Sequence, residues 1–204
     1  MPPIVSEEYK EKKKKEILKS AMKAFGEKGY QVATIDDIVA YSGMSKGAIY
    51  NYFESKEDIY VQLMNAQTER DLSRFKQETD ALSTSTEKLR YFFTTFSGVN
   101  LNEQKQRSIQ VQIEFFLNSG RDKQLKKLMI DRFKNLYQKL LKDIIDEGKR
   151  TGEFGSDVES EIIAALFWGI LDGVSLHYSV IGDQDLYRNT IKKAEEIVLQ
   201  HVQR

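Results

Sequence analysis

Apolar residues recur three and four positions apart through most of the chain, the spacing that places side chains on one face of an α-helix. Polar and charged residues fill the positions between them. The pattern predicts an all-α fold that follows a short disordered tail at residues 1–9. The predicted helices cover about residues 10–28, two short segments between 34 and 56, and then 57–82, 89–96, 109–117, 122–148, 158–181 and 186–202.

Capping residues divide the segment between Thr34 and Lys56 into two short helices and the start of a third. Thr34, with Asp37 three residues later, has the pattern of a capping box, in which each side chain accepts a hydrogen bond from an otherwise unpaired backbone N–H. Gly43 is expected to end the first short helix in the left-handed conformation, and Ser45 to cap the second. Two short helices across a glycine turn predict a helix-turn-helix, whose second helix lies in the major groove of DNA.

Similar signals mark other helix ends. Ser55, with Asp58 three residues later, predicts the start of the third helix, and Thr84 or Ser85 predicts the start of the helix at 89–96. Ser156 or Asp157 is expected to cap the helix at 158–181.

The segment GMSKGAIYNYFESKEDI, residues 43–59, resembles the DNA-binding signature of TetR-type transcriptional regulators. The resemblance extends back through TIDDIV to the FGEKGY that ends at Tyr30, and so covers about the first 60 residues. It implies an N-terminal three-helix, helix-turn-helix DNA-binding domain and a C-terminal helical effector-binding and dimerisation domain. We place the first at residues 1–56 and the second at 57–204, which includes the linking helix at 57–82.

Four residues of the motif carry hydroxyl or ammonium groups suited to phosphate oxygens, contacts that fix register without reading sequence. In proteins of the resembled family the matching residues contact the DNA backbone. Thr34 is equally well explained as a helix cap, and Tyr52 as partly core. The four are Thr34, Tyr50, Tyr52 and Lys56.

Ser45, Lys46 and Asn51 are better suited to base edges, because lysine pairs with guanine, asparagine with adenine and serine with either. Ser45 is equally well explained as a cap. Gly47 would let the helix approach the duplex closely, whereas Ile49 and Phe53 are expected in the core.

The motif departs from the family pattern at three positions. Val39 replaces the usual alanine at a close helix crossing, and Ala48 replaces a common threonine that can donate to phosphate. Asp36 is acidic near the expected DNA surface, so we expect it to point away.

Local charge favours DNA binding although the net charge is zero. Residues 10–28 hold eight lysines against three glutamates, a local excess of five positive charges. This excess can attract phosphates in a salt-dependent way. For any single lysine, a solvated helix face is the simpler interpretation.

The last two predicted helices are interpreted as a dimer interface that forms a four-helix bundle from two copies. The segment 158–181 is apolar nearly all round and so needs partners on both sides. The alternative is that it forms the centre of a monomeric core. The residues expected at the interface are Ala165, Gly169, Gly173, Ile191, Ile197 and Val198.

Aromatic residues are numerous in the predicted body, and apolar cavities between helices are where small molecules bind. For most of these residues a plain core position is the simpler interpretation. Asp172 or Glu114 could pair with a cationic ligand, and His177 could bind an effector or sit at an interface. The residues expected at a ligand site are Phe92, Phe96, Phe115, Phe116, Phe133, Tyr137, Phe167 and Trp168.

The remaining composition excludes several classes. The chain has no cysteine and only two histidines, and it shows no phosphate loop, metal spacing or nucleophile–base pair. We therefore expect no cofactor, no metal and no enzymatic activity. We find no signal peptide and no uncharged apolar run of membrane-spanning length, and so expect a cytoplasmic protein without a membrane partner.

The sequence as a whole predicts a dimeric regulator of transcription, of the kind that is most often a repressor. It would bind a near-palindromic, double-stranded DNA operator and be released by a small, largely apolar molecule. The alternatives are an all-helical enzyme and an architectural DNA-binding protein without an effector site.

Overall fold

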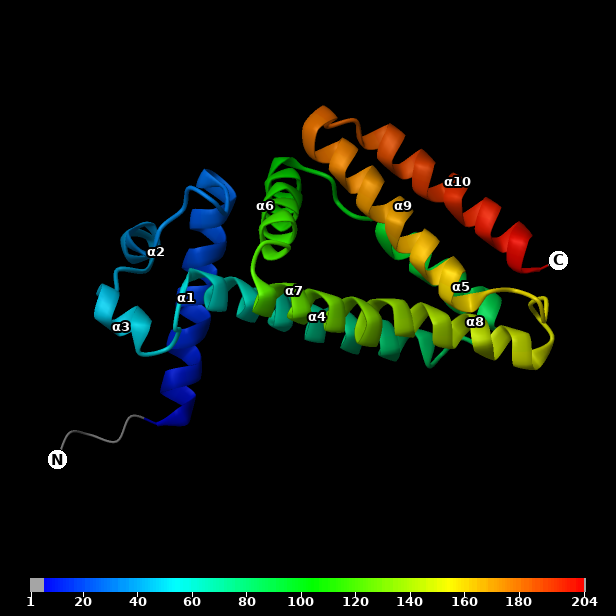
Figure 1. Ribbon diagram of the computed structural model, residues 1–204, viewed down its shortest axis with the longest axis horizontal. Helices are drawn as coiled ribbons and strands as arrows, with labels where there is room; N and C mark the ends of the chain where they lie inside the picture. Colours follow the sequence, from blue (N-terminus) through cyan, green and yellow to red (C-terminus); the bar gives the residue numbers. More distant parts are fainter. Residues whose placement is uncertain (1–5, 204) are drawn as a thin grey trace. The chain divides into compact units, whose positions relative to one another are not determined.

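The computed structural model describes residues 6–203, and within this range every regular element is helical (Figure 1). The predicted all-α class is therefore confirmed. The elements are α1 (Glu7–Lys28), α2 (Ile35–Ser42), α3 (Lys46–Tyr50), α4 (Lys56–Thr79), α5 (Ser85–Ser97), α6 (Glu103–Ser119), α7 (Lys123–Arg132), the π-helical segment η1 (Phe133–Gln138), α8 (Lys139–Thr151), α9 (Ser160–Ile181) and α10 (Gln184–Val202).

The chain divides into two compact units within α4, one ending at Phe75 and the other beginning at Lys76. We call them the head and the body. The predicted domain boundary after Lys56, which assigns α4 beyond its first residue to the C-terminal domain, stays a prediction.

The head is built around α1, which packs against α2, while α3 follows α2 across a turn. Ile17, Ile38 and Ile49, one from each helix, are completely buried, and Phe53 is buried after α3. Because α3 has little more than one turn, burial of Ile49 is what fixes its orientation. The predicted core positions of Ile49 and Phe53 are thus confirmed.

The caps predicted in the head are confirmed. Thr34 and Asp37 form the complete capping box, and the Ser45 hydroxyl accepts a hydrogen bond from the N–H of Ala48 at 3.2 Å. Gly43 ends α2 with φ at 67°, a left-handed conformation that a side chain would oppose.

The body has α9 at its centre, in contact with α6, α8, η1 and α10. Figure 1 shows α9 and α10 lying side by side as an antiparallel pair. Helix α5 packs against both α8 and α10. The side chains of Phe93, Phe115, Leu141 and Ile145 are fully buried and form much of the core.

Three predictions about the ends and regularity of the helices need correction. Helix α1 begins at Glu7 with Ser6 as its cap, so the tail prediction is wrong for residues 7–9, and residues 1–5 lie outside the described range. The helix expected at 122–148 contains the π-helical turn η1. Neither Ser156 nor Asp157 caps α9, which starts at Ser160 after Glu159 without a side-chain cap.

Helix α9 is the one described helix that is long and apolar enough to cross a membrane, judged by length and composition. It is not uncharged, because it contains Glu161 and Asp172. Its most apolar stretch is 33% buried within the body. The covered face packs against α6, α8 and α10, as in the core helix of a folded domain.

Candidate functional site

The α2–α3 region of the head presents a continuous set of exposed polar groups. Burial of Ile35, Ile38 and Ile49 turns the opposite sides of both helices outward. The predicted DNA-binding residues Thr34, Ser45, Lys46, Gly47, Tyr50 and Asn51 are all exposed, whereas Tyr52 and Lys56 are half-buried. The structure thus brings the predicted set onto one small part of the surface, with two members partly withdrawn.

Thr34 is engaged in its cap. Its hydroxyl accepts from the N–H of Asp37 at 3.3 Å and donates to the Asp37 carboxylate at 2.9 Å. A hydrogen bond from Lys28 and those from Thr34 lower the pKa of Asp37 to about 2. The capping role foreseen for Thr34 is therefore present, and a phosphate would have to share its hydroxyl.

Lys56 has a different role from the one predicted. Its ammonium donates to three backbone carbonyls of the loop before α2, those of Tyr30 at 2.9 Å, Gln31 at 3.2 Å and Ala33 at 3.1 Å. It also lies 4.7 Å from the centre of the Tyr30 ring. An ammonium has three hydrogens to donate, so these carbonyls occupy all of them. In this structure Lys56 holds the loop in place and is not free to contact phosphate.

Lys46, at the first position of α3, pairs with Asp36 of α2. The ammonium lies 3.0 Å from both carboxylate oxygens. The expectation that Asp36 points away from the DNA-reading surface is therefore wrong. The carboxylate lies beside a residue predicted to read bases.

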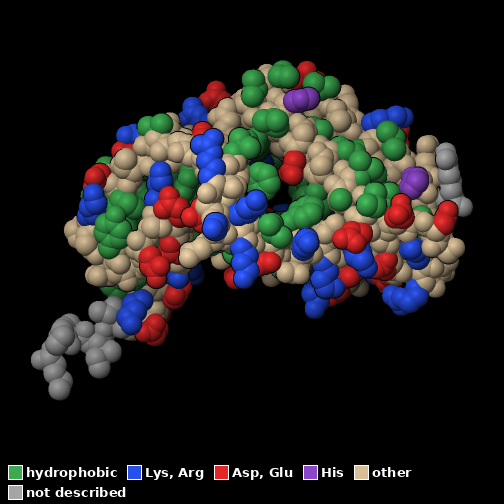
Figure 2. Space-filling model, in the orientation of Figure 1, with side chains coloured by type: hydrophobic (Ala, Val, Ile, Leu, Met, Phe, Trp, Pro, Cys, Tyr) green, Lys and Arg blue, Asp and Glu red, His purple; other side chains and the backbone are tan. Residues whose placement is uncertain are grey.

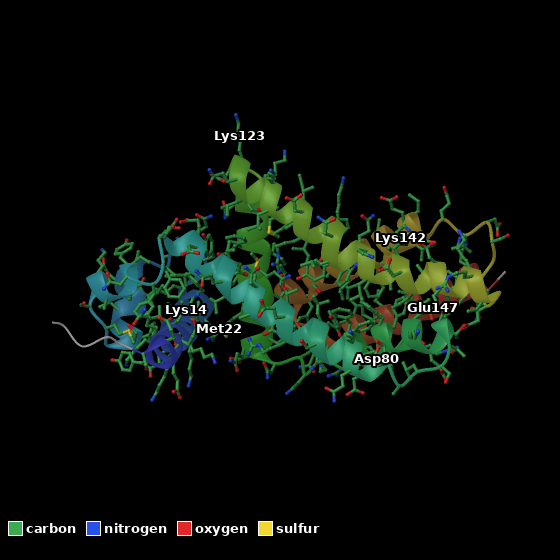
Figure 3. The ribbon with its side chains drawn as sticks, turned by 90° about the horizontal axis from the view of Figure 1, so that it is seen from below. Lys14, Met22, Asp80, Lys123, Lys142 and Glu147 are labelled. Atoms are coloured by element: carbon green, nitrogen blue, oxygen red, sulfur yellow. The ribbon has the colours of Figure 1, made fainter. Side chains whose placement is uncertain are left out.

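The first turns of α1 also face this region, which our residue-by-residue predictions missed. Lys14, labelled in Figure 3, places its ammonium 6.0 Å from the centre of the Phe53 ring, just beyond α3. The signal was present in the sequence. Lys14 precedes Ile17 and Ala21 by three and seven residues, so it continues the apolar stripe of α1 onto the side where the helix-turn-helix packs.

The body carries a second uncovered surface, which is apolar. Side chains three or four residues apart along α9 remain exposed although the opposite face is buried. In Figure 2 hydrophobic side chains gather over the part of the surface formed by α9 and α10. We call this row of exposed and partly exposed residues the α9 stripe: Ile162, Leu166, Gly169, Gly173, Leu176 and Val180.

The structure divides the residues predicted at the dimer interface. Gly169 and Ile197 are exposed, and Ala165 and Gly173 are partly exposed. Ile191 and Val198 are only 2% and 1% exposed because α10 turns them into the core of its own subunit. Ile191 and Val198 are therefore core residues, and their assignment to the interface was wrong.

Comparison with known proteins covers both parts of the chain. The family model for bacterial regulatory proteins of the tetR family matches residues 17–63, and the tetracyclin repressor-like C-terminal domain model matches residues 88–187. The chain belongs to the TetR family of transcriptional regulators.

Individual similarities extend over most of the chain. The HTH-type transcriptional regulator YfiR of Bacillus subtilis (strain 168) is 26% identical over 174 residues, which are 85% of this chain and 83% of that protein. FadR from Bacillus subtilis, solved in complex with stearoyl-CoA, superposes with a TM-score of 0.74 at 22% identity and covers 92% of this chain and 98% of its own. A putative regulator from Saccharomonospora viridis, in complex with choline, gives a TM-score of 0.79 at 19% identity and covers 95% of this chain and 100% of its own.

TetR-family membership confirms the predicted class of function. Regulators of this family are DNA-binding proteins and not enzymes, they bind operators as dimers, and they respond to small molecules. The exposed polar face of α2–α3 lies within the segment matched by the TetR DNA-binding model.

Part of the predicted ligand site forms a real cluster. The rings of Phe92, Phe96, Phe167 and Trp168 lie with centroids 5.1–6.1 Å apart, mostly edge to face. The Tyr137 ring lies 5.1 Å from that of Trp168, whose indole N–H donates to the Tyr137 carbonyl at 3.1 Å. The rings fill the space between one another, so a ligand can enter this cluster only if they separate.

The other predicted ligand residues lie outside this cluster. Phe116 and Phe133 are exposed, and Phe115 is buried in the core on α6. A shallow pocket lies elsewhere, at the turn between α9 and α10, and is lined by residues that include His177, Tyr178, Leu186 and Tyr187. Asp172 is on α9, where desolvation raises the pKa of its carboxyl group.

Proposed function

We propose that this protein represses transcription by binding a near-palindromic operator as a homodimer, and that a small, largely apolar molecule releases it. The observation that carries the proposal is the exposed polar face of α2–α3, which joins base-reading and phosphate-binding chemistry on helices anchored by buried isoleucines. We place the protein in the cytoplasm, where its operator would be.

Within the DNA interface, Lys46, Asn51 and Ser45 read base edges, while Tyr50 and Tyr52 contact phosphates. Thr34 joins them when its hydroxyl hydrogen turns from the Asp37 carboxylate to a phosphate oxygen. Lys56 supports the loop before α2 from behind. Lys14 of α1 adds a positive charge near the end of α3. The exposed positions of Lys46, Asn51 and Tyr50 support this division of roles.

Gly47 gives the most direct test of DNA contact. A Cβ added to Gly47 meets no atom within 4 Å, so the space around it in the protein is open. Gly47→Ala should therefore fold normally, and alanine is a better helix former than glycine. If α3 lies in the major groove, the added methyl group meets the duplex and weakens binding.

Two copies joined through α9 and α10 would bring two α3 helices to one operator. The α9 stripe supports this arrangement, because contiguous exposed apolar surface commonly marks an interaction site. Ile197 on α10 extends the apolar surface, and the small side chains of Ala165, Gly169 and Gly173 would allow a close helix crossing.

The effector site is proposed at the aromatic cluster around Trp168. Different solved neighbours carry stearoyl-CoA and choline, so the shared fold does not select one ligand class. Aromatic rings suit either an apolar chain or a quaternary ammonium group. Stearoyl-CoA and choline are therefore the first two probes to use.

The test begins with selection of bound fragments from random duplex DNA, followed by titration of the selected operator. We expect one near-palindromic sequence, a dimer in sedimentation, and tighter operator binding by wild type than by Gly47→Ala. Equal binding of all sequences would favour an architectural DNA-binding protein. Release of the operator by either probe would support the regulatory role.

A further inference from the structure

The ion pair between Lys46 and Asp36 lies within the proposed DNA-reading surface. Lys46 is the first residue of α3, and Asp36 is the second residue of α2. Their side chains are 52% and 70% exposed, and the ammonium is 3.0 Å from both carboxylate oxygens. The hydrogen bond to Asp36 raises the pKa of Lys46.

Folding does not depend on this pair. An exposed ion pair contributes little to stability, because water screens the attraction and two side chains lose freedom. Helix α2 has its own capping box in Thr34 and Asp37, and α3 is anchored by Ile49. A carboxylate on a surface that must approach phosphates is unfavourable on its own. Paired with Lys46, however, Asp36 presents a hydrogen-bond acceptor beside a donor.

The pair offers a donor and an acceptor side by side. In the major groove a G·C pair presents the guanine O6 acceptor beside the cytosine N4 donor, about 3 Å apart because these two atoms hydrogen-bond each other. Lysine donates to guanine O6 and N7, and aspartate accepts from cytosine N4. The 3.0 Å separation within the ion pair matches the separation of the two base groups.

We propose that Asp36 and Lys46 act together as one reading unit that selects a G·C pair in each half-site, with Asp36 as a specificity-determining residue. This rests on the proposed function, because it requires α3 in the major groove. The adjacent N7 acceptor of guanine favours G·C over A·T, since A·T presents its amino donor between two acceptors and adds the thymine methyl group. The carboxylate also cancels the lysine charge, so the unit adds little to non-specific attraction.

The experiment uses full-length protein and the operator selected by wild type. Each operator position is changed in turn, and competition binding measures the preference of wild type, Asp36→Asn, Lys46→Met and the double variant. We expect Asp36→Asn to lower the preference for G·C at one position of each half-site about tenfold, with little change elsewhere. In the Lys46→Met background, removing Asp36 should have much less effect, since the two residues act as a unit.

Glu54→Gln is the matched control, because it removes one exposed carboxylate from the same part of the head. It should raise affinity for all duplexes slightly and leave the preference unchanged. Thermal melting should show Asp36→Asn folded as wild type. Asp36→Glu, which keeps the charge and displaces it by one methylene, should also lose preference.

Unchanged base preference in Asp36→Asn would overturn the inference, whether or not overall affinity rises. An equal loss with and without Lys46 would overturn the idea of a joint unit. Failure of the wild type to select any sequence would instead contradict the proposed function, so the two failures are distinguishable.

Discussion

The α2–α3 face of the head and the α9 stripe of the body are both left uncovered by the fold, but their chemistry is opposite. The first carries hydroxyl, amide and charged side chains, including Ser45, Lys46 and Asn51. The second carries Ile162, Leu166, Leu176 and Val180. One surface is well hydrated when free, and the other is not.

This difference predicts two kinds of association. Apolar surface gains about 25 cal/mol for each Å² removed from water, so the α9 stripe favours permanent cover. The polar face exchanges water and counterions for DNA, and its binding depends on salt. With this division a ligand can release DNA while the two subunits stay joined, provided that it binds the DNA-free conformation more tightly than the DNA-bound one.

A charge placed in the α9 stripe should have the largest effect, because it should prevent dimerisation. Leu166→Glu puts a carboxylate where the partner helix would bury it, so sedimentation should show a monomer. Operator affinity should fall about 100- to 10,000-fold, since the second half-site contact is lost.

Leu117→Glu on α6 is the matched control, because Leu117 is an exposed leucine outside the stripe. It should stay dimeric and bind the operator normally. A Leu166→Glu protein that remains dimeric would show that the α9 stripe is not the interface.

In the wild-type protein, operator binding should depend on salt concentration and dimerisation should not. With about six to eight phosphate contacts per dimer, doubling the salt concentration should weaken operator binding roughly 40- to 150-fold. The mass in sedimentation should not change, because an apolar interface has no counterions to release. Dissociation of the dimer in parallel with loss of DNA would mean that charge holds both contacts.

Sequence reasoning succeeded where the chemistry is local. The capping box of Thr34 and Asp37, the left-handed Gly43 and the cap at Ser45 each depend on residues within four positions. Thr84 and Glu87 form the same arrangement at the start of α5. Such caps can be predicted from sequence because both hydrogen-bonding residues lie in the same short stretch.

It failed where the partner lies far away in sequence. The carbonyls that Lys56 binds are more than 20 residues away, and Asp36 turns toward Lys46 ten residues on. Ile191 and Val198 have the right spacing for an apolar face, but spacing does not say whether that face meets its own core or another subunit. Which face is covered is decided by long-range packing of α5 and α9 against α10.

Lys56 differs from the DNA-contacting residues of the head, because its charge stabilises the fold. Lys56→Met removes three hydrogen bonds from an ammonium group to backbone carbonyls, so stability should fall by about 1–3 kcal/mol. Operator affinity should drop about tenfold through displacement of the loop before α2, with an unchanged slope of log affinity against log salt. A direct phosphate contact would instead lower that slope by about 0.9 for each subunit.

Affinity measured at several salt concentrations, with a thermal melt of each variant, distinguishes these results. Tyr50→Phe is the comparison, because removing a phosphate-binding hydroxyl should weaken binding without lowering the melting temperature. A Lys56→Met protein as stable as wild type would refute the structural role.

The smallest effect concerns a charge in the body that should serve stability alone. The Glu153 carboxylate accepts from the backbone N–H groups of Ser85 at 2.9 Å and Thr86 at 3.0 Å, and so caps α5 from the loop after α8. Burial alone would raise the pKa of Glu153, but these hydrogen bonds outweigh it and leave the pKa below its usual value. Loss of such a cap typically costs about 1 kcal/mol, or roughly 2–4 °C in a protein of this size.

Glu153→Gln should show this loss at pH 7 and not in acid. A depressed pKa means that the folded state holds the proton less readily, so the stabilisation is present above the unfolded pKa of about 4.3 and disappears as the pH falls through the folded value. Glu159→Gln, at the uncapped start of α9, makes the same charge change without that contact and should melt as wild type. Operator affinity should be unchanged in both variants, because these charges of the body serve the fold whereas those of α2–α3 contact DNA. Weaker DNA binding by Glu153→Gln alone would contradict this division of roles.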